Sequence, residues 1–166
     1  MFLTGYHGTS MKSANKIINE KRFDLSNSGT EWLGPGIYFY FNFSDAYNWR
    51  NAEAIMHSVI EVDEDAYLDI DSIEGRKVLR GIVNHIAAKQ NKNVVLTDSY
   101  IKNQCAVMKV VWDKCPEIKA MAASFHTERT KIKMLLDVRP ERREFCIRDN
   151  DCIRHTYLIK RSDVCD

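Results

Sequence analysis

Three short stretches of the sequence contain residues whose types could bind a ligand or take part in catalysis. The first is His7-Gly8, at the end of an apolar segment, where a ring with two nitrogen sites lies beside a backbone free of side-chain bulk. The second is a glycine-rich turn that runs into the aromatic residues Tyr38 and Phe39. The third is Glu144, a carboxylate within a run of residues that favour β-strands. Together they offer a surface that a planar ligand could approach and a carboxylate that could act on it.

Each stretch also has a purely structural interpretation. His7 is consistent with a core histidine whose nitrogens are hydrogen-bonded within the protein. The turn Trp32–Gly36 is consistent with a tight connection into a core strand, and Glu144 with an outward-facing strand residue. The three stretches are more informative together than any one of them is alone.

Strands at both ends of the chain must carry these residues. The polar stretch Asp24–Gly36 predicts a loop between the first two strands, and the turn Asp149-Asn150-Asp151 separates the last two. The predicted strands are Phe2–Thr9, Ile37–Tyr40, Ser58–Val62, Ala66–Ile70, Arg143–Arg148 and Cys152–Ile159.

Helices fill the intervals between these strands. Ser10 is predicted to cap a helix that carries Met11, Ala14, Ile17 and Ile18, and Ser44 a helix that carries Ala46, Trp49, Ala52 and Met56. Asp71 and Glu74 resemble a capping box ahead of an amphipathic helix over Val78–Ile86. The stretch Asn103–Asp113 fits a helix and a strand equally poorly. This order of elements predicts an α+β fold in which the terminal strands meet in one core.

Composition places the chain among single folded domains. Its 166 residues predict one domain spanning 1–166, with 45% hydrophobic and 28% charged residues. No apolar run is long enough to span a bilayer and the N-terminus lacks a leader pattern, so we expect a cytoplasmic protein that makes no membrane contact. The five cysteines form an odd set without a C-x-x-C pair, which favours reduced thiols and supports neither a disulfide framework nor a metal site.

In this order the three stretches resemble the ADP-ribosyltransferase family of the poly(ADP-ribose) polymerase type, which has a His, Tyr, Glu signature on three strands. His7-Gly8-Thr9 resembles that family's H-G-[ST], and Gly36–Phe39 resembles its G-I-Y-F. The segment Ser44–Trp49 is similar to the family's helix that ends in a second ring-stacking aromatic residue, and Glu144–Ile153 is similar to its closing hairpin. The middle, Val62–Pro140, aligns with no part of the eukaryotic enzymes and is closer to compact bacterial and phage-associated relatives.

The resemblance implies an ADP-ribosyltransferase-like split antiparallel β core with flanking helices, and NAD as co-substrate without a metal. Glu144 would bind the ribose beside the breaking nicotinamide bond, and Tyr38 and Trp49 would stack on the nicotinamide ring. His7 would bind the adenosine ribose, and Gly8 the carboxamide with Thr9 beside it. The loop Asn27–Leu33 is expected near the NAD. One departure is Ala46, where better-known polymerases keep a serine that also binds the carboxamide.

The resemblance also implies transfer of single ADP-ribose units to a macromolecule, by a toxin or phage-defence effector that could have an antitoxin partner. A nucleic-acid acceptor, RNA or DNA, is favoured slightly over protein, because seven basic and three acidic residues lie within Arg129–Arg148. A solvated face is the alternative interpretation of that segment. The alternative functions are NAD hydrolysis with water as acceptor and an inactive module that binds NAD or ADP-ribose.

Overall fold

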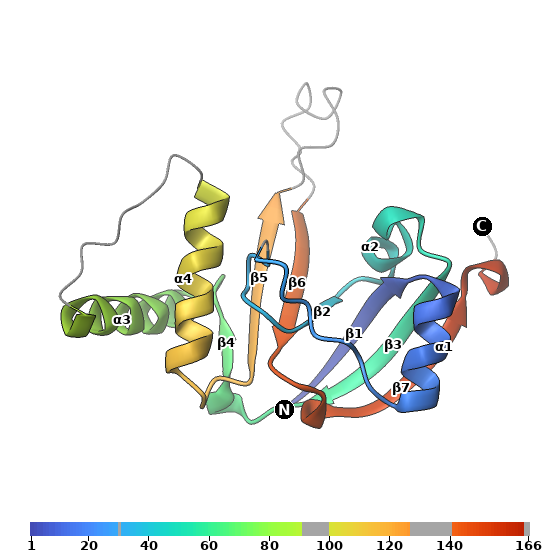
Figure 1. Ribbon diagram of the computed structural model, residues 1–166, viewed down its shortest axis with the longest axis horizontal. Coiled ribbons are helices and arrows are strands. Elements are labelled where there is room, and N and C mark those ends of the chain that lie inside the picture. The colour runs from blue at the N-terminus through green and yellow to red at the C-terminus, as the bar shows by residue number, and fades with distance from the viewer. Residues whose placement is uncertain (30, 91–99, 127–140, 165–166) are drawn as a thin grey trace, which may run out of the picture.

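A sheet of seven strands runs through the molecule in the order β4-β5-β6-β2-β1-β3-β7 (Figure 1). The structure is a computed structural model that describes residues 1–29, 31–90, 100–126 and 141–164. Neighbouring strands are antiparallel except for β4 and β5, which are parallel. The strands are β1 (Phe2–Thr9), β2 (Ile37–Tyr40), β3 (Ala54–Glu61), β4 (Tyr67–Asp69), β5 (Ala120–His126), β6 (Glu141–Ile147) and β7 (Ile153–Lys160). Terminal strands and helices thus combine in an α+β fold, as the sequence predicts.

The sheet is divided between β1 and β2. β1 pairs with β3 over its whole length, from Phe2 to Thr9, but it pairs with β2 only at Tyr6 and Tyr40. In Figure 1 the strands β1, β3 and β7 are inclined to the nearly upright β5 and β6. The two halves of the sheet therefore meet at one residue pair and separate beyond it.

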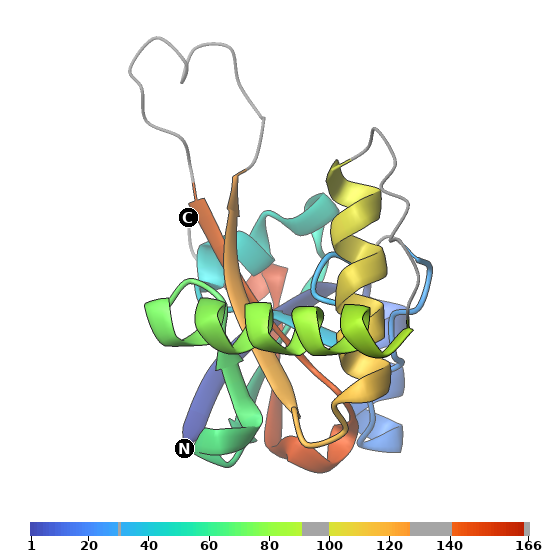
Figure 2. The same ribbon diagram turned by 90° about the vertical axis from the view of Figure 1, so that its left-hand side faces the viewer.

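Each half of the sheet has its own helical cover. The helices are α1 (Met11–Glu20), α2 (Phe43–Tyr47), α3 (Ile73–Gln90) and α4 (Tyr100–Lys114). The Ser10 hydroxyl caps α1 as predicted, and Ala14 and Ile17 of α1, which packs on β3 and β7, belong to the core. On the other half, α3 crosses α4 beside β4 and β5 (Figure 2), and Trp112 of α4 is buried there. Among the described residues no helix has the length and apolar character that crossing a membrane requires.

The prediction of the second helix is wrong beyond Tyr47. It ends at Tyr47, the short 3-10 helix η1 (Trp49–Asn51) follows, and β3 already begins at Ala54. Arg50 and Asn51 have positive φ angles of 43° and 56°, which break the helical path. Ser44 does not cap this helix either, since the N-cap residue of α2 is Asn42.

Three further features differ from the prediction or were left open by it. The capping box is wrong, because the Ser72 hydroxyl accepts the Gly75 N–H at 2.8 Å while the Asp71 carboxylate accepts both donors of Ser124. The ambiguous stretch Asn103–Asp113 lies entirely in α4. Strand β5 was not predicted, and it fills the position between β4 and β6. Remaining short 3-10 helices are η2 (Glu64–Ala66), η3 (Asn150–Cys152) and η4 (Arg161–Asp163).

The cysteines for which the structure gives an environment are free and buried. They are Cys105, Cys115, Cys146 and Cys152. Cys165 lies outside the described residues.

Candidate functional site

A cavity of about 400 Å³ opens where β1 and β2 separate. Five of the six predicted site residues line it: His7, Gly8, Tyr38, Trp49 and Glu144. The sixth, Thr9, does not line the cavity; it ends β1, where it pairs with Ala54. The wall also includes residues that the sequence did not single out, namely Asp24, Glu31, Tyr40, Arg50 and Phe125, together with Trp32 of the predicted turn.

The hydrogen-bonding pattern of β1 fixes which of its peptide groups face the cavity. The Met1 ammonium group donates to the Val62 carbonyl at 2.7 Å, and the Val62 N–H donates back to Met1 at 3.0 Å. Such mutually bonded residues alternate along an antiparallel strand. Odd-numbered residues of β1 therefore direct their peptide groups towards β3, and even-numbered residues direct theirs towards β2.

Gly8 is the even-numbered residue at the point where the sheet divides. In the register of Tyr6 with Tyr40, Gly8 would pair with Tyr38, but this pair is not formed. Instead the His7 ring donates from Nδ1 to the Tyr38 carbonyl at 2.8 Å. Within the described residues, the N–H and C=O of Gly8 consequently face the cavity without a strand partner.

Gly8 also permits α2 to approach the sheet. A Cβ atom at this position would overlap the Ala46 carbonyl oxygen and would lie 3.1 Å from the Cβ of Trp49. Ala46 itself is completely buried and does not line the cavity. The side of Gly8 that lacks a side chain, where the sequence suggested room for a ligand, is thus covered by the segment that holds Trp49. A ligand would instead approach the N–H and C=O groups of Gly8.

His7 is held in one tautomer by its contacts. A carbonyl can only accept, so the Nδ1 bonded to Tyr38 carries the proton, and Nε2 of the neutral ring is an acceptor. Burial lowers the pKa of His7, although the Tyr38 carbonyl raises it, and the net shift is downward. Phe23 and Phe39 hold the ring edge-on, with centroids at 5.4 and 6.0 Å. The site therefore holds a neutral imidazole whose Nε2 has no hydrogen-bond partner among the residues that the structure describes.

Tyr38 supports the glycine-rich turn through its hydroxyl. It accepts the Leu33 N–H at 2.9 Å and donates to the Gly34 carbonyl at 2.8 Å. Burial raises the pKa of Tyr38 far above its ordinary value, so the phenol stays protonated. Tyr38 lines the cavity. Because its hydroxyl is bonded within the turn, the ring is the part of the side chain that could contact a ligand.

Glu144 is a buried carboxylate, 7% exposed, on β6 directly opposite Tyr40 of β2. The Trp32 indole N–H donates to its Oε2 at 3.0 Å, and the Tyr40 hydroxyl also bonds to the carboxylate. Burial raises the pKa of Glu144 and these two bonds lower it, with a net rise above 4.5. Trp32 packs on Phe125, with ring centroids 4.7 Å apart. Two donors thus orient the carboxylate at the cavity wall.

Glu31 fastens the loop that carries Trp32. Its carboxylate accepts the Ser26 hydroxyl at 2.6 Å, the Ser28 N–H and hydroxyl at 2.5 and 2.7 Å, and the Gly29 N–H at 2.7 Å. Burial raises the pKa of Glu31, but the bonds from Ser26 and Ser28 outweigh it and bring the pKa to about 2. Sequence reasoning missed Glu31 and Trp32; the available signal was a carboxylate within a loop of serine, asparagine and glycine.

Replacing Glu31 with glutamine should loosen this loop. Glutamine places an NH₂ group against donors, which should lower the free energy of unfolding by about 1–3 kcal/mol at pH 7. Since the folded pKa lies below the ordinary 4.5, this contribution is present above pH 4.5 and fades as the pH falls towards 2. Urea unfolding at pH 7 and pH 3 measures both values. Asp24→Asn, at a side chain 79% exposed, is the control and should change little. An equal loss of unfolding free energy at both pH values would contradict the role of the ionised Glu31 carboxylate in holding the loop.

The arginines of the basic segment that the structure describes are engaged within the protein. Arg142 pairs with Asp45 at 3.4 Å, and Arg143 pairs with Asp69 at 2.5 Å. Arg148 donates to backbone carbonyls, including that of Ile118 at 2.9 Å. These three side chains therefore add little to a nucleic-acid surface. The other basic residues, Arg129, Lys131, Lys133 and Arg139, lie outside the described residues.

Comparison with known proteins gives one partial similarity. No protein-family model matches the chain, and no match was found among solved structures. The chain is 36% identical over 83 residues to an uncharacterized protein of Methanocaldococcus jannaschii. This similarity covers 43% of the chain and 39% of that protein. The chain therefore spans about two fifths of the length of this relative, and the function must be argued from the site.

Proposed function

We propose that the protein is an NAD-dependent mono-ADP-ribosyltransferase that cleaves the nicotinamide–ribose bond and transfers ADP-ribose to a macromolecule. The observation that carries the proposal is the composition of one cavity. It brings together the peptide edge of Gly8, which has no strand partner among the described residues, the aromatic side chains of Tyr38 and Trp49, and the buried carboxylate of Glu144. The corresponding finer fold is a split β core of the ADP-ribosyltransferase type, which the single pairing between β1 and β2 supports.

The peptide edge and the two rings suit a nicotinamide group. A carboxamide has one acceptor and two donors, which complement the N–H and C=O of Gly8. The nicotinamide ring of NAD is flat and positively charged, so the electron-rich faces of Tyr38 and Trp49 attract it. His7 completes the binding of the dinucleotide, because its Nε2 can accept a hydrogen bond from an adenosine ribose hydroxyl.

Glu144 supplies the negative charge that bond cleavage requires. The C–N bond breaks with its electron pair leaving on nicotinamide, and positive charge develops on the ribose. An ionised Glu144 beside the ribose hydroxyl stabilises that charge. An acceptor nucleophile then forms the new bond to the ribose carbon and gives up its proton, for which the same carboxylate is a suitable base. Trp32 and Tyr40 hold the carboxylate in place during these steps.

The pH dependence of turnover tests the bond between Trp32 and Glu144. Because only the ionised carboxylate stabilises the charge, activity should rise with pH through a value above 4.5. Trp32→Phe keeps a ring but removes the N–H donor, which should raise the pKa of Glu144 and move this acidic limb to higher pH. Phe125→Leu, which disturbs the packing of Trp32 and spares the hydrogen bond, is the control. An unshifted limb in Trp32→Phe would show that the bond does not act on catalysis.

Labelled NAD tests the proposed transfer and identifies the acceptor. Purified protein is incubated with cell extract and biotinylated NAD, and the products are treated separately with ribonuclease, deoxyribonuclease and protease. Attached label supports transfer, and the treatment that releases it gives the acceptor class. A nucleic-acid acceptor keeps its slight preference here because of the basic residues between positions 129 and 139. Release of nicotinamide without any attached label would replace transfer with hydrolysis.

A further inference from the structure

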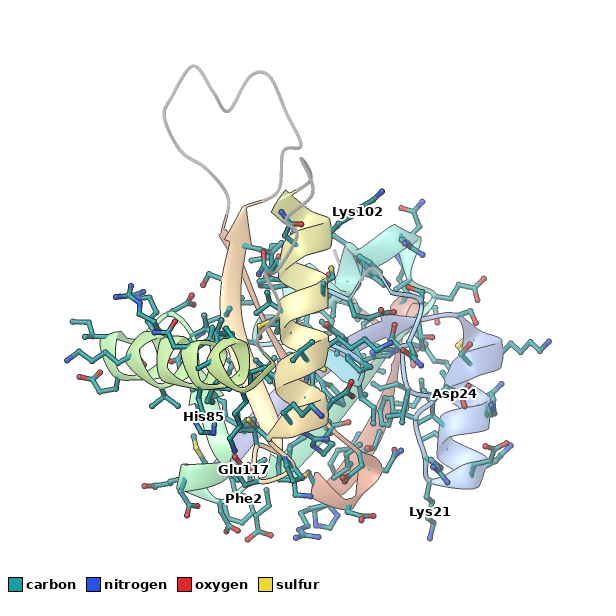
Figure 3. All side chains as sticks on the ribbon, turned by 60° about the vertical axis from the view of Figure 1, so that its left-hand side comes forward. Phe2, Lys21, Asp24, His85, Lys102 and Glu117 are labelled. Carbon is teal, nitrogen blue, oxygen red and sulfur yellow. The ribbon has the colours of Figure 1, made fainter. Side chains whose placement is uncertain are left out.

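The cavity wall contains more negative than positive charge. Its carboxylates are Asp24, Glu31 and Glu144, whereas Arg50 is the one permanently charged cation among its described lining residues. Asp24 is paired with Lys16 at 2.8 Å, and Glu31 is bonded to its own loop. Asp24 lies in the loop that follows α1, beside that helix (Figure 3), and its side chain is 79% exposed. A ligand with two negative charges would therefore find its counter-charge mainly at Arg50.

Arg50 has a backbone conformation that non-glycine residues seldom adopt. Its φ of 43° and that of Asn51 at 56° place two consecutive residues in the left-handed region. The segment is held from both sides by Arg161, whose guanidinium donates to the Tyr47 carbonyl at 3.0 Å and the Ala52 carbonyl at 3.2 Å. Such strained residues persist when their surroundings hold them, and they concentrate at ligand-binding sites.

The Arg50 side chain is near the proposed nicotinamide position and is not neutralised. Its guanidinium lies 4.7 Å from the centroid of the Trp49 ring. Within the part of the chain that the structure describes, no carboxylate forms an ion pair with it. A guanidinium offers a planar set of donors that matches phosphate oxygens, and such bonds are among the stronger ones in proteins.

We propose that Arg50 binds the diphosphate of the dinucleotide and thereby selects a diphosphate-containing substrate. The inference rests on the proposed function, because it requires NAD in this cavity. One ribose separates nicotinamide from the diphosphate, and Arg50 directly follows Trp49, the residue that stacks on the nicotinamide ring. The guanidinium turns from the Trp49 face to the diphosphate when the dinucleotide binds.

The test compares NAD binding by calorimetry in the wild type, Arg50→Gln and Arg50→Lys. Loss of the charge-assisted bonds in Arg50→Gln should weaken NAD binding by about ten- to a hundredfold, and Arg50→Lys should recover part of it. Nicotinamide release at NAD concentrations far below saturation should fall by a similar factor in Arg50→Gln, because the loss is in NAD binding. The control variant is Arg154→Gln, which also removes an arginine charge. Arg154 lies at the start of β7 and does not line the cavity, so NAD affinity should be unchanged.

Each result separates this inference from the proposed function. NAD affinity in folded Arg50→Gln equal to that of the wild type would overturn the inference and leave the function standing. Weaker labelling of nucleic acid with unchanged NAD affinity would also overturn it, by assigning Arg50 to the acceptor. A wild type that does not bind NAD at all would overturn the proposed function and this inference together. The wild-type affinity should also fall as salt rises, more steeply than that of Arg50→Gln.

Discussion

Replacing Glu144 with glutamine is expected to lower ADP-ribose transfer and nicotinamide release by about a thousandfold while NAD binding is retained. Glutamine has the same shape but cannot carry the negative charge that faces the ribose. The Trp32 indole N–H can still donate to the glutamine oxygen, so the side chain should keep its position. Transfer of label and NAD affinity, measured on the same preparation, separate turnover from binding.

The thermal stability of the Glu144→Gln variant provides a second test of the environment assigned to Glu144. Because burial raises the pKa of Glu144, the folded state disfavours the ionised carboxylate as pH rises above 4.5. Removing that charge should leave the melting temperature at neutral pH unchanged or higher. Glu61→Gln, at a half-exposed carboxylate paired with Arg154, is the activity control and should retain wild-type turnover. Turnover by Glu144→Gln within tenfold of the wild type would remove Glu144 from the catalytic role.

Replacing Gly34 with alanine is expected to have the largest effect on stability, with a loss of about 3 kcal/mol or more. Gly34 has a φ of 89°, and a Cβ atom there would overlap the buried indole ring of Trp112. The Trp112 indole N–H also donates to the Leu33 carbonyl, so the clash falls on a hydrogen-bonded contact. The Tyr38 hydroxyl donates to the Gly34 carbonyl, and NAD binding should weaken as well.

Alanine substitutions at two other glycines distinguish the cost of a left-handed backbone conformation from the cost of steric overlap with a neighbouring side chain. Gly29 has a φ of 86° with open space around a built Cβ, so Gly29→Ala should lose only about 1 kcal/mol from the left-handed conformation. Gly81 lies in α3 with an ordinary φ and open space, and Gly81→Ala should gain up to about 1 kcal/mol. Urea unfolding of the three variants gives the comparison. A loss for Gly34→Ala no greater than for Gly29→Ala would show that the contact with Trp112 is unimportant.

Local patterns in the sequence predicted the elements that carry the candidate site. The apolar strand that ends in His7-Gly8, the aromatic strand that carries Tyr38 and the β-prone run around Glu144 are all strands in the structure. Ser10 caps α1 because a hydroxyl before an amphipathic stretch satisfies free backbone N–H groups. These elements depend on neighbouring residues alone, and for that reason sequence patterns identify them.

The elements that were missed depend on distant contacts. Met56 fits a helical pattern after Trp49, but it lies in β3 because that strand pairs with β1 opposite His7. The bond between Trp32 and Glu144 joins residues 112 positions apart, which no spacing pattern reports. Gly8 was interpreted as space for a ligand, and the structure shows that α2 fills this space. Strand pairing, a long-range hydrogen bond and the packing of α2 on the sheet decided these positions.

A crystal structure of the Glu144→Gln variant with NAD tests the central claim most directly, because this variant should bind the dinucleotide without consuming it. The claim predicts the carboxamide bonded to the N–H and C=O of Gly8, with the nicotinamide ring between Tyr38 and Trp49. It also predicts the ribose next to residue 144 and His7 Nε2 at the adenosine ribose. A dinucleotide bound outside the gap between β1 and β2, or a cavity that stays empty at saturating NAD, would contradict it.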